Sequence, residues 1–167
     1  MEQLEDSVDA FRNATRIDPD YAEAFSRMAI VQTELKRYAK AVENHLEVIR
    51  VRPESSPAYY NLAVTLSHQN KLEEAVDAYR QAVRLDPENI YAFHNMGMLQ
   101  AKMDRPEAAI QSHKQVIRIK PDHAPSHYQL GKAFIATGNK PDALDQYSIL
   151  KSLNSDLAEE LFAVLYP

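Results

Sequence analysis

The chain has 167 residues, of which 45% are hydrophobic and 26% charged, a composition typical of globular proteins that argues against a disordered or membrane-embedded chain. Nineteen Lys and Arg against 24 Asp and Glu give a net charge of −5, and no basic block is present, so we expect no nucleic-acid partner. The absence of cysteine excludes disulfides, thiolate nucleophiles and cysteine-ligated metal sites.

The N-terminal residues, 1–6, include Glu2, Glu5 and Asp6 and no apolar run, so we expect no signal peptide at this end. The longest stretch without charged residues, 55–70, contains several polar side chains and is shorter than the roughly 20 apolar residues of a membrane span. A chain without cysteine is also compatible with a reducing compartment. We therefore expect a cytoplasmic protein that does not insert into membranes.

Apolar residues recur along the chain at the i, i+3, i+4 spacing of amphipathic helices, for example at Phe25, Met28 and Ala29. In chain order this spacing predicts ten helices, near residues 4–17, 22–35, 39–52, 56–69, 72–85, 90–103, 106–119, 124–137, 140–153 and 156–166. The sequence therefore predicts an all-α fold.

Proline recurs with a fixed step of 34 residues, at Pro19, Pro53, Pro87 and Pro121. Two further columns keep this step, namely Ala41, Ala75, Ala109 and Ala143, and Met28, Leu62, Met96 and Leu130. Each proline follows the second of two predicted helices and ends the unit, because proline cannot continue a helix. The chain is therefore built from repeated helix-turn-helix units.

These columns resemble the tetratricopeptide repeat (TPR), a family whose unit is 34 residues of helix, turn and helix. The resemblance covers four full repeats, 22–55, 56–89, 90–123 and 124–157. Residues 1–21 resemble the second helix of a preceding repeat. Residues 156–167 resemble the helix that closes such arrays, and Asp156 and Glu159 form a D-x-x-E capping pattern there. The resemblance implies that residues 1–167 form a single array, an all-α, right-handed superhelical solenoid of TPR repeats.

Small residues at two columns predict close helix packing. Ala75 and Ala109 are expected to be nearly fully buried between helices. Gly97 and Gly131 alternate with alanines in another column, and we expect them to let the two helices of a repeat approach each other closely.

Two repeats carry a polar pair in columns where the other repeats have apolar and aromatic residues. The pairs are Gln32 with His45 and Gln100 with His113, in place of Leu66 with Tyr79 and Phe134 with Tyr147. An unpaired buried polar group costs on the order of 1 to 3 kcal/mol, so we expect each Gln to be hydrogen-bonded to its His.

No motif for catalysis or for a cofactor is present in the sequence. The spacing of the three glycines excludes the common dinucleotide and nucleoside-triphosphate motifs. His123 and His127 have an H-x-x-x-H spacing, but Pro125 lies between them and no nearby carboxylate completes a ligand set. We therefore expect no metal site, no cofactor and no enzymatic activity.

Charge is distributed unevenly between the two helices of a repeat. In the second to fourth repeats the first helices carry only Lys102 and Lys132, whereas the second helices carry twelve charged residues. A solvated helix face normally carries charge, so the first helices are predicted to contact a partner. Proteins of the family resembled here place these helices on an inner, concave wall. The expected peptide-binding groove contains Arg27, Tyr60, Asn61, Val64, Tyr91, His94, Asn95, Met98, Tyr128, Gln129 and Lys132.

Asn61 and Asn95 stand one repeat apart in a column that also contains Arg27 and Gln129. Side-chain amides both donate and accept hydrogen bonds, so this column is predicted to hold a peptide backbone. It resembles the asparagine ladder in the superhelical repeats of O-linked N-acetylglucosamine transferases. The alternative is that the two asparagines only bond between adjacent helices.

The carboxylate clamp with which other TPR proteins hold chaperone tails is not matched. Ser26 and Ile30 stand where the clamp has Lys and Asn, and Tyr91 and Asn95 stand where it has Lys and Arg. Asn61 alone fits, so a chaperone-tail adaptor is disfavoured.

The predicted function is a non-catalytic protein–protein interaction module that binds an extended peptide or partner segment. One alternative is a substrate-recognition fragment of a larger multidomain enzyme such as a transferase. Another is a homo-oligomeric scaffold that assembles through the C-terminal helix. In that helix Leu161 and Leu165 belong to an apolar row that Val164 is expected to join, and Phe162 is expected on a second, apolar edge that another molecule covers.

Overall fold

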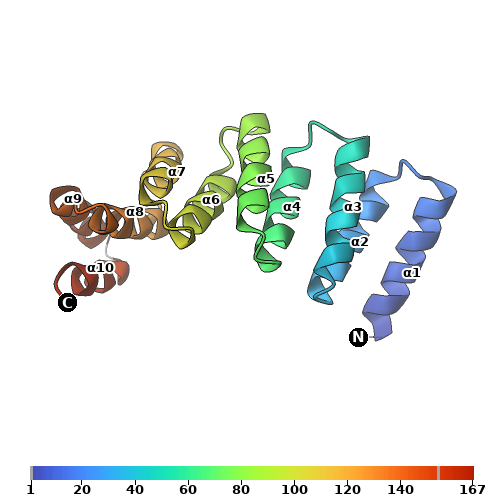
Figure 1. Cartoon of the computed structure of the whole chain (residues 1–167), viewed down its shortest axis with the longest axis horizontal. Helices are drawn as coiled ribbons and strands as arrows, with labels where there is room; N and C mark the ends of the chain where they lie inside the picture. Colours follow the sequence, from blue (N-terminus) through green and yellow to red (C-terminus); the bar gives the residue numbers. More distant parts are fainter. Residues whose placement is uncertain (1, 154) are drawn as a thin grey trace. The chain divides into compact units, whose positions relative to one another are not determined.

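The structure is a computed structural model that describes residues 2–153 and 155–167, and all regular secondary structure in this part of the chain is α-helical (Figure 1). The helices form two compact units, Met1–Pro87 and Glu88–Pro167. The type and order of the predicted helices are confirmed over the described residues, and their ends differ from the predicted ends by at most two residues.

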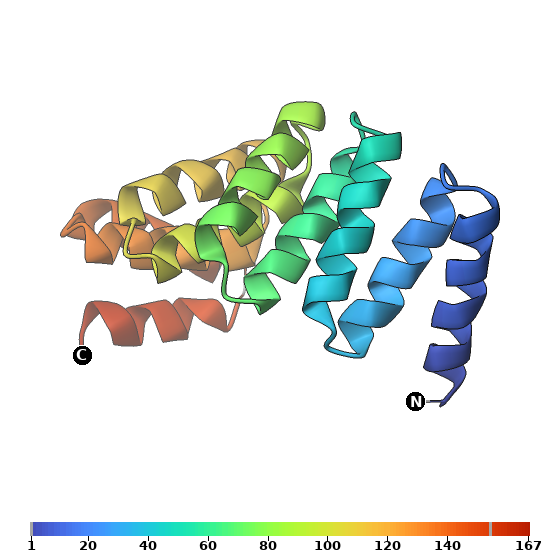
Figure 2. The same ribbon diagram turned by 45° about the vertical axis from the view of Figure 1, so that its right-hand side comes forward.

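The first unit contains α1 (Glu2–Ile17), α2 (Ala22–Glu34), α3 (Tyr38–Val51), α4 (Ser56–His68) and α5 (Leu72–Leu85). Successive helices pack on one another, so the five lie side by side in sequence order (Figure 2). Ala41 on α3 and Ala75 on α5 are completely buried. Their small side chains permit the close packing of helices that the repeated alanine column predicted.

The second unit contains α6 (Ile90–Lys102), α7 (Pro106–Ile119), α8 (Ala124–Ala136), α9 (Lys140–Ser152) and α10 (Leu157–Leu165). The first four pack in sequence order, and α10 packs on both α8 and α9. Ala109 and Ala143 are completely buried in the core of this unit, together with Leu150 and Leu161. In the description below, α2, α4, α6 and α8 are the first helices of the repeats, and α3, α5, α7 and α9 are the second helices.

The turn between the two helices of each repeat contains one residue with left-handed backbone conformation. These residues are Lys36 (φ 58°), Asn70 (φ 58°), Asp104 (φ 56°) and Gly138 (φ 75°). In the first repeat the amide of Lys36 donates to the carbonyl of Thr33 at 2.9 Å, and the amide of Arg37 donates to that of Gln32 at 2.8 Å. This pattern is a Schellman motif, which satisfies the last carbonyls of the first helix and turns the chain into the second.

The junctions between repeats combine an extended residue with a helix cap. The residues before the three later prolines have φ of −131° to −135°; they are Arg52, Asp86 and Lys120. A following proline favours this extended conformation. The side chain of the residue just before the next helix then accepts a hydrogen bond from a backbone amide three residues later, at Ser55, Asn89 and His123.

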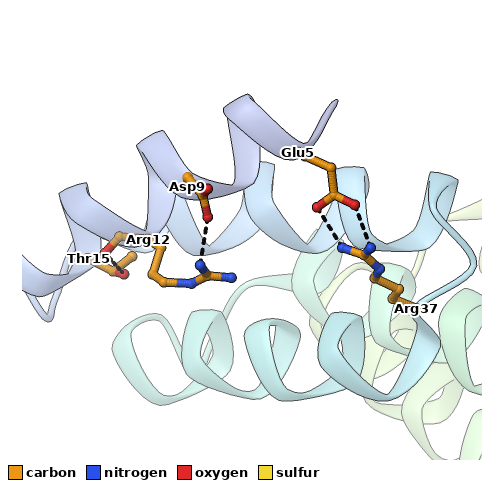
Figure 3. A network of polar contacts seen from close by, with 5 residues as sticks. All are labelled: Glu5, Asp9, Arg12, Thr15 and Arg37. Atoms are coloured by element: carbon orange, nitrogen blue, oxygen red, sulfur yellow. Dashed lines mark hydrogen bonds and ion pairs between the residues drawn. The ribbon is translucent and has the colours of Figure 1, made fainter. Parts of the chain in front are cut away.

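An ion pair links α1 to the start of α3 (Figure 3). The guanidinium of Arg37 donates two hydrogen bonds to the carboxylate of Glu5, one of them 2.7 Å long. These bonds are the main cause of a lowered pKa at Glu5. A second pair on α1 joins Arg12 to Asp9 at 2.6 Å. All four side chains are in contact with solvent, with 41–67% of each exposed, so each pair contributes little to stability.

At the two glycines that lie within helices, the missing side chain leaves room for a side chain of a neighbouring helix. A Cβ atom added at Gly97 on α6 would lie 2.7 Å from Nε2 of His113 on α7, so the expected close approach of paired helices is confirmed there. A Cβ atom added at Gly131 on α8 would instead lie 2.5 Å from Cδ2 of Leu161 on α10. The expectation for Gly131 is therefore corrected: this glycine makes room for α10 rather than for the paired helix α9.

The expected hydrogen bonds between buried Gln and His side chains are wrong. The carbonyl oxygen of the Gln100 side chain accepts a 2.6 Å hydrogen bond from Ser112, the residue before His113. Neither ring nitrogen of His113 has a hydrogen-bond partner among the described residues, and the same holds for the side-chain carbonyl oxygen of Gln32. A closer serine hydroxyl therefore replaces histidine as the partner of Gln100.

The start of α10 lacks the predicted capping pattern. Asp156 makes no side-chain cap, and the hydroxyl oxygen of Ser155 accepts a 3.3 Å hydrogen bond from the amide of Leu157 instead. Ser155, two residues before the helix, therefore supplies the side-chain hydrogen bond that the D-x-x-E pattern assigned to Asp156.

The apolar face of α10 is confirmed in part. Leu161 and Leu165 are buried, and Phe162 is 42% exposed, as predicted. Val164 is also 42% exposed, so its predicted place in the buried row is wrong. In the four full repeats the column of Val164 is buried, but no helix of the described chain follows α10 to cover it.

Candidate functional site

The first unit contributes four of the predicted site residues, and two of them are engaged within the protein. Arg27 on α2 donates a 2.7 Å hydrogen bond to Glu23 on the same helix, and both side chains are largely exposed. The ring of Tyr60 on α4 lies 5.8 Å, centroid to centroid, from that of Tyr79 on α5. The charge of Arg27 is therefore offset by that of Glu23, and the ring of Tyr60 is held in place by its contact with Tyr79.

Asn61 on α4 lies between two cavities of the first unit. One has a volume of about 140 Å³ and includes Ile30, Val64 and Thr65 in its wall. The other has a volume of about 220 Å³ and includes Ser26 and Arg52. Asn61 itself is half-buried, and the structure records no hydrogen bond from its side-chain amide to another described residue. An amide in this position can both donate to and accept from a group that enters either cavity.

His45 on α3 lines the same two cavities as Asn61. The side chain is 2% exposed, and burial lowers the pKa of His45 to about 4, so the imidazole is neutral at pH 7. No hydrogen bond from this ring to another described residue is recorded. His45 therefore adds a second polar group with unused bonding capacity to the wall. The sequence placed His45 only in a core column, because its position gave no sign that a cavity reaches the ring.

The larger of these two cavities is lined by the N-terminal turns of two helices and by charged side chains. Its wall includes residues from the first turns of both α2 and α4, the helix ends at which the helix dipole places partial positive charge. Arg52, at the end of α3, adds a full positive charge, while the negative charge of Glu23 is offset by Arg27. Neither Ser26 nor Arg52 was predicted as a binding residue.

The second unit contributes the other seven predicted residues. On α6, Tyr91 and Met98 are exposed, whereas His94 and Asn95 are half-buried. On α8 the predicted residues are all half-buried; they are Tyr128, Gln129 and Lys132. Asn61 and Asn95 lie in different units, so the ladder that joins them stays a prediction.

Tyr128 is fixed by two neighbours within the second unit. The ammonium group of Lys132 lies 4.7 Å from the centre of the Tyr128 ring, a cation–π distance. Burial raises the pKa of the Tyr128 hydroxyl, and the charge and hydrogen bond of Glu160 on α10 raise it further. Tyr128 therefore belongs to the contact between α8 and α10 as well as to the predicted binding surface.

His94 joins a cluster of three histidines and one serine. Its Nδ1 atom lies 3.0 Å from the hydroxyl oxygen of Ser126, which is also 3.0 Å from Nδ1 of His123. The His94 ring packs edge-to-face against both His113 and His123, with centroids 5.3 and 5.4 Å apart. Burial, and secondarily the positive charge of other members, lowers the pKa of His94 and reduces that of His113 to about 3. The analysis of the sequence singled out only His94 for binding.

Two other classes of site find no support in the part of the chain that the structure describes. No group of three or more His, Cys, Asp or Glu side chains is arranged to hold a metal ion there. His127, half of the H-x-x-x-H spacing, is buried and engaged with Gln146 and the carbonyl of Pro121, each at 2.8 Å. None of the described helices combines the length and apolar character needed to cross a bilayer.

Comparison with known protein families identifies a known repeat in part of the sequence. Sequence patterns described as tetratricopeptide repeat match residues 56–89 and 78–111. The match at 56–89 coincides with the second full repeat inferred from the proline period. No curated protein matches the sequence.

Solved structures share the fold over most of the chain. The crystal structure of MamA superposes with a TM-score of 0.85 at 19% identity, over 90% of this chain and 88% of its own. MamA 41-end from Desulfovibrio magneticus RS-1 gives a TM-score of 0.80 at 18% identity, over 90% of this chain and 85% of its own. YrrB, described as a TPR protein with an unusual peptide-binding site, gives 0.82 at 22% identity, over 95% and 83%. Residues 56–111 therefore match the tetratricopeptide repeat, and the chain shares the fold of solved tetratricopeptide repeat proteins such as YrrB.

Proposed function

We propose that this protein is a non-catalytic interaction module that binds an extended segment of a partner protein on the first helices of its repeats. The observation that carries the proposal is the wall around Asn61 and His45. Two polar side chains with no recorded side-chain hydrogen bond to a described residue face two cavities that are open to an incoming group. A ligand that donates to or accepts from these groups therefore gains hydrogen bonds that the protein itself does not make there.

The chemistry of the first helices supports a peptide as the ligand. They carry few charges, so their polar contacts depend on amide, hydroxyl and imidazole groups, which bind neutral polar groups such as the peptide backbone. Asn95 on α6 repeats Asn61 after one 34-residue step, which matches a chain that runs from repeat to repeat. The fold likeness to YrrB, whose description names a peptide-binding site, fits the same role. The absence of cysteine fits action in the reducing cytoplasm.

Removal of both asparagine amides tests the proposal. A ten-residue peptide array, probed with the wild-type protein, supplies the tightest-binding sequence, which is called the array peptide below. Each lost hydrogen bond costs about 0.5 to 1.5 kcal/mol, so Asn61→Ala/Asn95→Ala should weaken binding of the array peptide roughly 5-fold to 150-fold. Fluorescence anisotropy measures the dissociation constants.

Asn13→Ala provides the matched control, because Asn13 is an exposed asparagine on α1 outside the predicted surface. It should leave the affinity unchanged. Equal affinities of the wild type and the double variant, or a wild type that binds no peptide in the array, would contradict the proposed function.

A further inference from the structure

The hydrogen bonds around Ser126 determine which nitrogen of His94 carries a proton. Three side chains form the chain of contacts, His94 on α6, Ser126 on α8 and His123 just before α8, and we call them the His94 relay. Ser126 is completely buried, so its hydroxyl has no access to solvent. Both imidazole contacts of the hydroxyl are 3.0 Å long, a hydrogen-bond distance on each side.

The direction of these bonds follows from the cap of α8. The backbone amide of Ser126 donates a shared hydrogen bond to the carbonyl of His123 at 3.0 Å and to Nδ1 of the same residue at 3.3 Å, so we take this nitrogen as an acceptor that bears no proton. The Ser126 hydroxyl must therefore donate its single hydrogen to His123. The hydroxyl oxygen is then left to accept from His94, and Nδ1 of His94 must carry the proton.

We propose that the second unit binds an N–H donor of the partner at Nε2 of His94, which the relay through Ser126 to His123 fixes as a hydrogen-bond acceptor. His94 is half-buried on α6, one residue from Asn95. An asparagine amide both donates and accepts, whereas the His94 ring in this state offers only an acceptor to a ligand. The site therefore selects a backbone amide N–H over a carbonyl group. This assignment rests on the proposed function, because it takes the donor to be the backbone of the bound segment.

The repeat columns mark the relay as a feature of one repeat. The residues equivalent to Ser126 in the other full repeats are Ala24, Ala58 and Ala92, all of which are buried. The residues equivalent to His123 before α4 and α6 are Ser55 and Asn89, which cap their helices in the same way. A buried serine in an alanine column and an imidazole in a cap column occur together only at α8 among the described caps.

The surroundings keep the relay neutral and set the sign of its pH dependence. The titratable groups that face His94 are His113 on α7 and His123, and Lys132 on α8 adds positive charge near His113. All three imidazoles have lowered pKa values, with burial as the first cause. A proton added to Nε2 of His94 would convert the acceptor into a donor. Binding should therefore weaken as the pH falls through the pKa of His94, by up to about tenfold per pH unit.

Two substitutions taken from the other repeats separate the relay from the general structure. Ser126→Ala installs the alanine that the other three full repeats have at this position, and it removes the hydroxyl group. His123→Asn gives α8 the cap residue that α6 has at Asn89. It keeps an acceptor, the side-chain oxygen of asparagine, in place of Nδ1 of the imidazole. Both variants should remain folded, because the equivalent columns already accommodate these residues; circular dichroism melts verify this.

The protonation state can be read directly in the free protein. Long-range 1H–15N correlation spectra of the labelled wild type at pH 7 should show His94 protonated at Nδ1 and His123 protonated at Nε2. The His123→Asn variant should keep the His94 state, and Ser126→Ala should lose it, because the acceptor for the Nδ1 proton is gone. A wild-type His94 protonated at Nε2, or a state unaffected by Ser126→Ala, would overturn the inference whatever the protein binds.

Ester analogues of the array peptide test the ligand assignment. Each analogue replaces one backbone N–H by an ester oxygen, which removes a donor without adding bulk. One analogue should bind the wild type about 2-fold to 10-fold more weakly, as expected for one lost hydrogen bond, and should bind Ser126→Ala with a much smaller loss. If Asn61→Ala/Asn95→Ala weakens binding but no ester position depends on Ser126, the inference fails while the proposed function stands. If the wild type binds no peptide, both fail.

Discussion

Two buried imidazoles make the stability of this protein depend on pH. His45 and His113 are 2% and 1% exposed, and burial lowers their pKa values to about 4 and about 3. In His113 the charges of His94, His123 and Lys132 act in the same direction. An unfolded histidine titrates near 6.5, so in mildly acidic solution the unfolded chain takes up protons that the native protein excludes.

The free energy of unfolding should therefore fall as the pH drops from about 6.5 towards 4. Both folded pKa values lie below the unfolded value, so the stabilisation is complete above pH 6.5 and is lost on acidification. Each histidine contributes up to about 1.4 kcal/mol per pH unit over this interval. Urea unfolding at a series of pH values measures the slope.

Gln32→Leu/His45→Tyr is the comparison variant, since it installs the pair that Leu66 and Tyr79 form in the second repeat. It removes one titrating group together with the unpartnered carbonyl oxygen of Gln32. The variant should be more stable by about 1 to 3 kcal/mol at pH 7 and should lose part of the slope. A slope equal to that of the wild type would show that His45 does not stay neutral in the native protein.

The residues of the candidate site differ in how far the sequence alone could predict their roles. Asn61 stood out because it repeats after 34 residues on a charge-poor helix, and the structure places it beside two cavities. The role of His45 was hidden, because periodicity assigns a residue to the core without showing a cavity beside it. Ser126 left a visible signal, a serine in a column of alanines, but its meaning depends on the distances to two imidazoles.

At the scale of the helices and their turns, the same left-handed residue position recurs in all four full repeats. Only Gly138 meets the conformational requirement without strain; Asn70 and Asp104 belong to the residue types that tolerate positive φ, whereas Lys36 carries a side chain that disfavours it. The turns are held by backbone hydrogen bonds to the preceding helix, so the geometry does not depend on the side chain present.

Substitutions in these turns should change stability in opposite directions. Lys36→Gly should raise the free energy of unfolding by about 0.5 to 1 kcal/mol, because it relieves backbone strain. Gly138→Ala should lower it by about 1 kcal/mol; a Cβ atom there meets no other atom within 4 Å, so strain alone accounts for the loss. Asn70→Gly should have a smaller effect, since asparagine tolerates this conformation. Urea denaturation measures all three, and a stabilising Gly138→Ala would contradict the assignment of strain.

The helices were predictable because the 34-residue period fixes their number, order and ends at once. The predicted hydrogen-bond partners were wrong where two neighbouring residues could both make the bond and a single short contact decided between them. Ser112 rather than His113 donates a hydrogen bond to Gln100, and Ser155 rather than Asp156 accepts a side-chain hydrogen bond from the first amide of α10. The left-handed turns were not foreseen, because three of the four contain no glycine.

On the scale of the whole molecule, the exposed aromatic edge of α10 is the feature that bears on assembly. The Phe162 ring lies between those of Tyr147 and Tyr166, with centroids 5.5 and 4.9 Å away. Phe162 and Tyr166 remain substantially exposed. Association of copies through this edge stays a prediction.

Sedimentation velocity over a range of protein concentrations tests this association. Burial of a phenylalanine side chain contributes about 1.5 to 3 kcal/mol, so the sedimentation coefficient of the wild type should rise with concentration and that of Phe162→Ser should rise less. A wild type that stays monomeric at every concentration, with the variant indistinguishable from it, would leave the exposed edge without a role in self-association.

The central claim is that the first helices of the repeats bind an extended segment of a partner through the side-chain amides of Asn61 and Asn95. Titration of the array peptide into 15N-labelled protein, followed through the side-chain amide signals of the asparagines, tests it most directly. The account predicts that the signals of Asn61 and Asn95 shift with a single dissociation constant while that of Asn13 stays fixed. Shifts confined to the second helices, or different dissociation constants at Asn61 and Asn95, would contradict it.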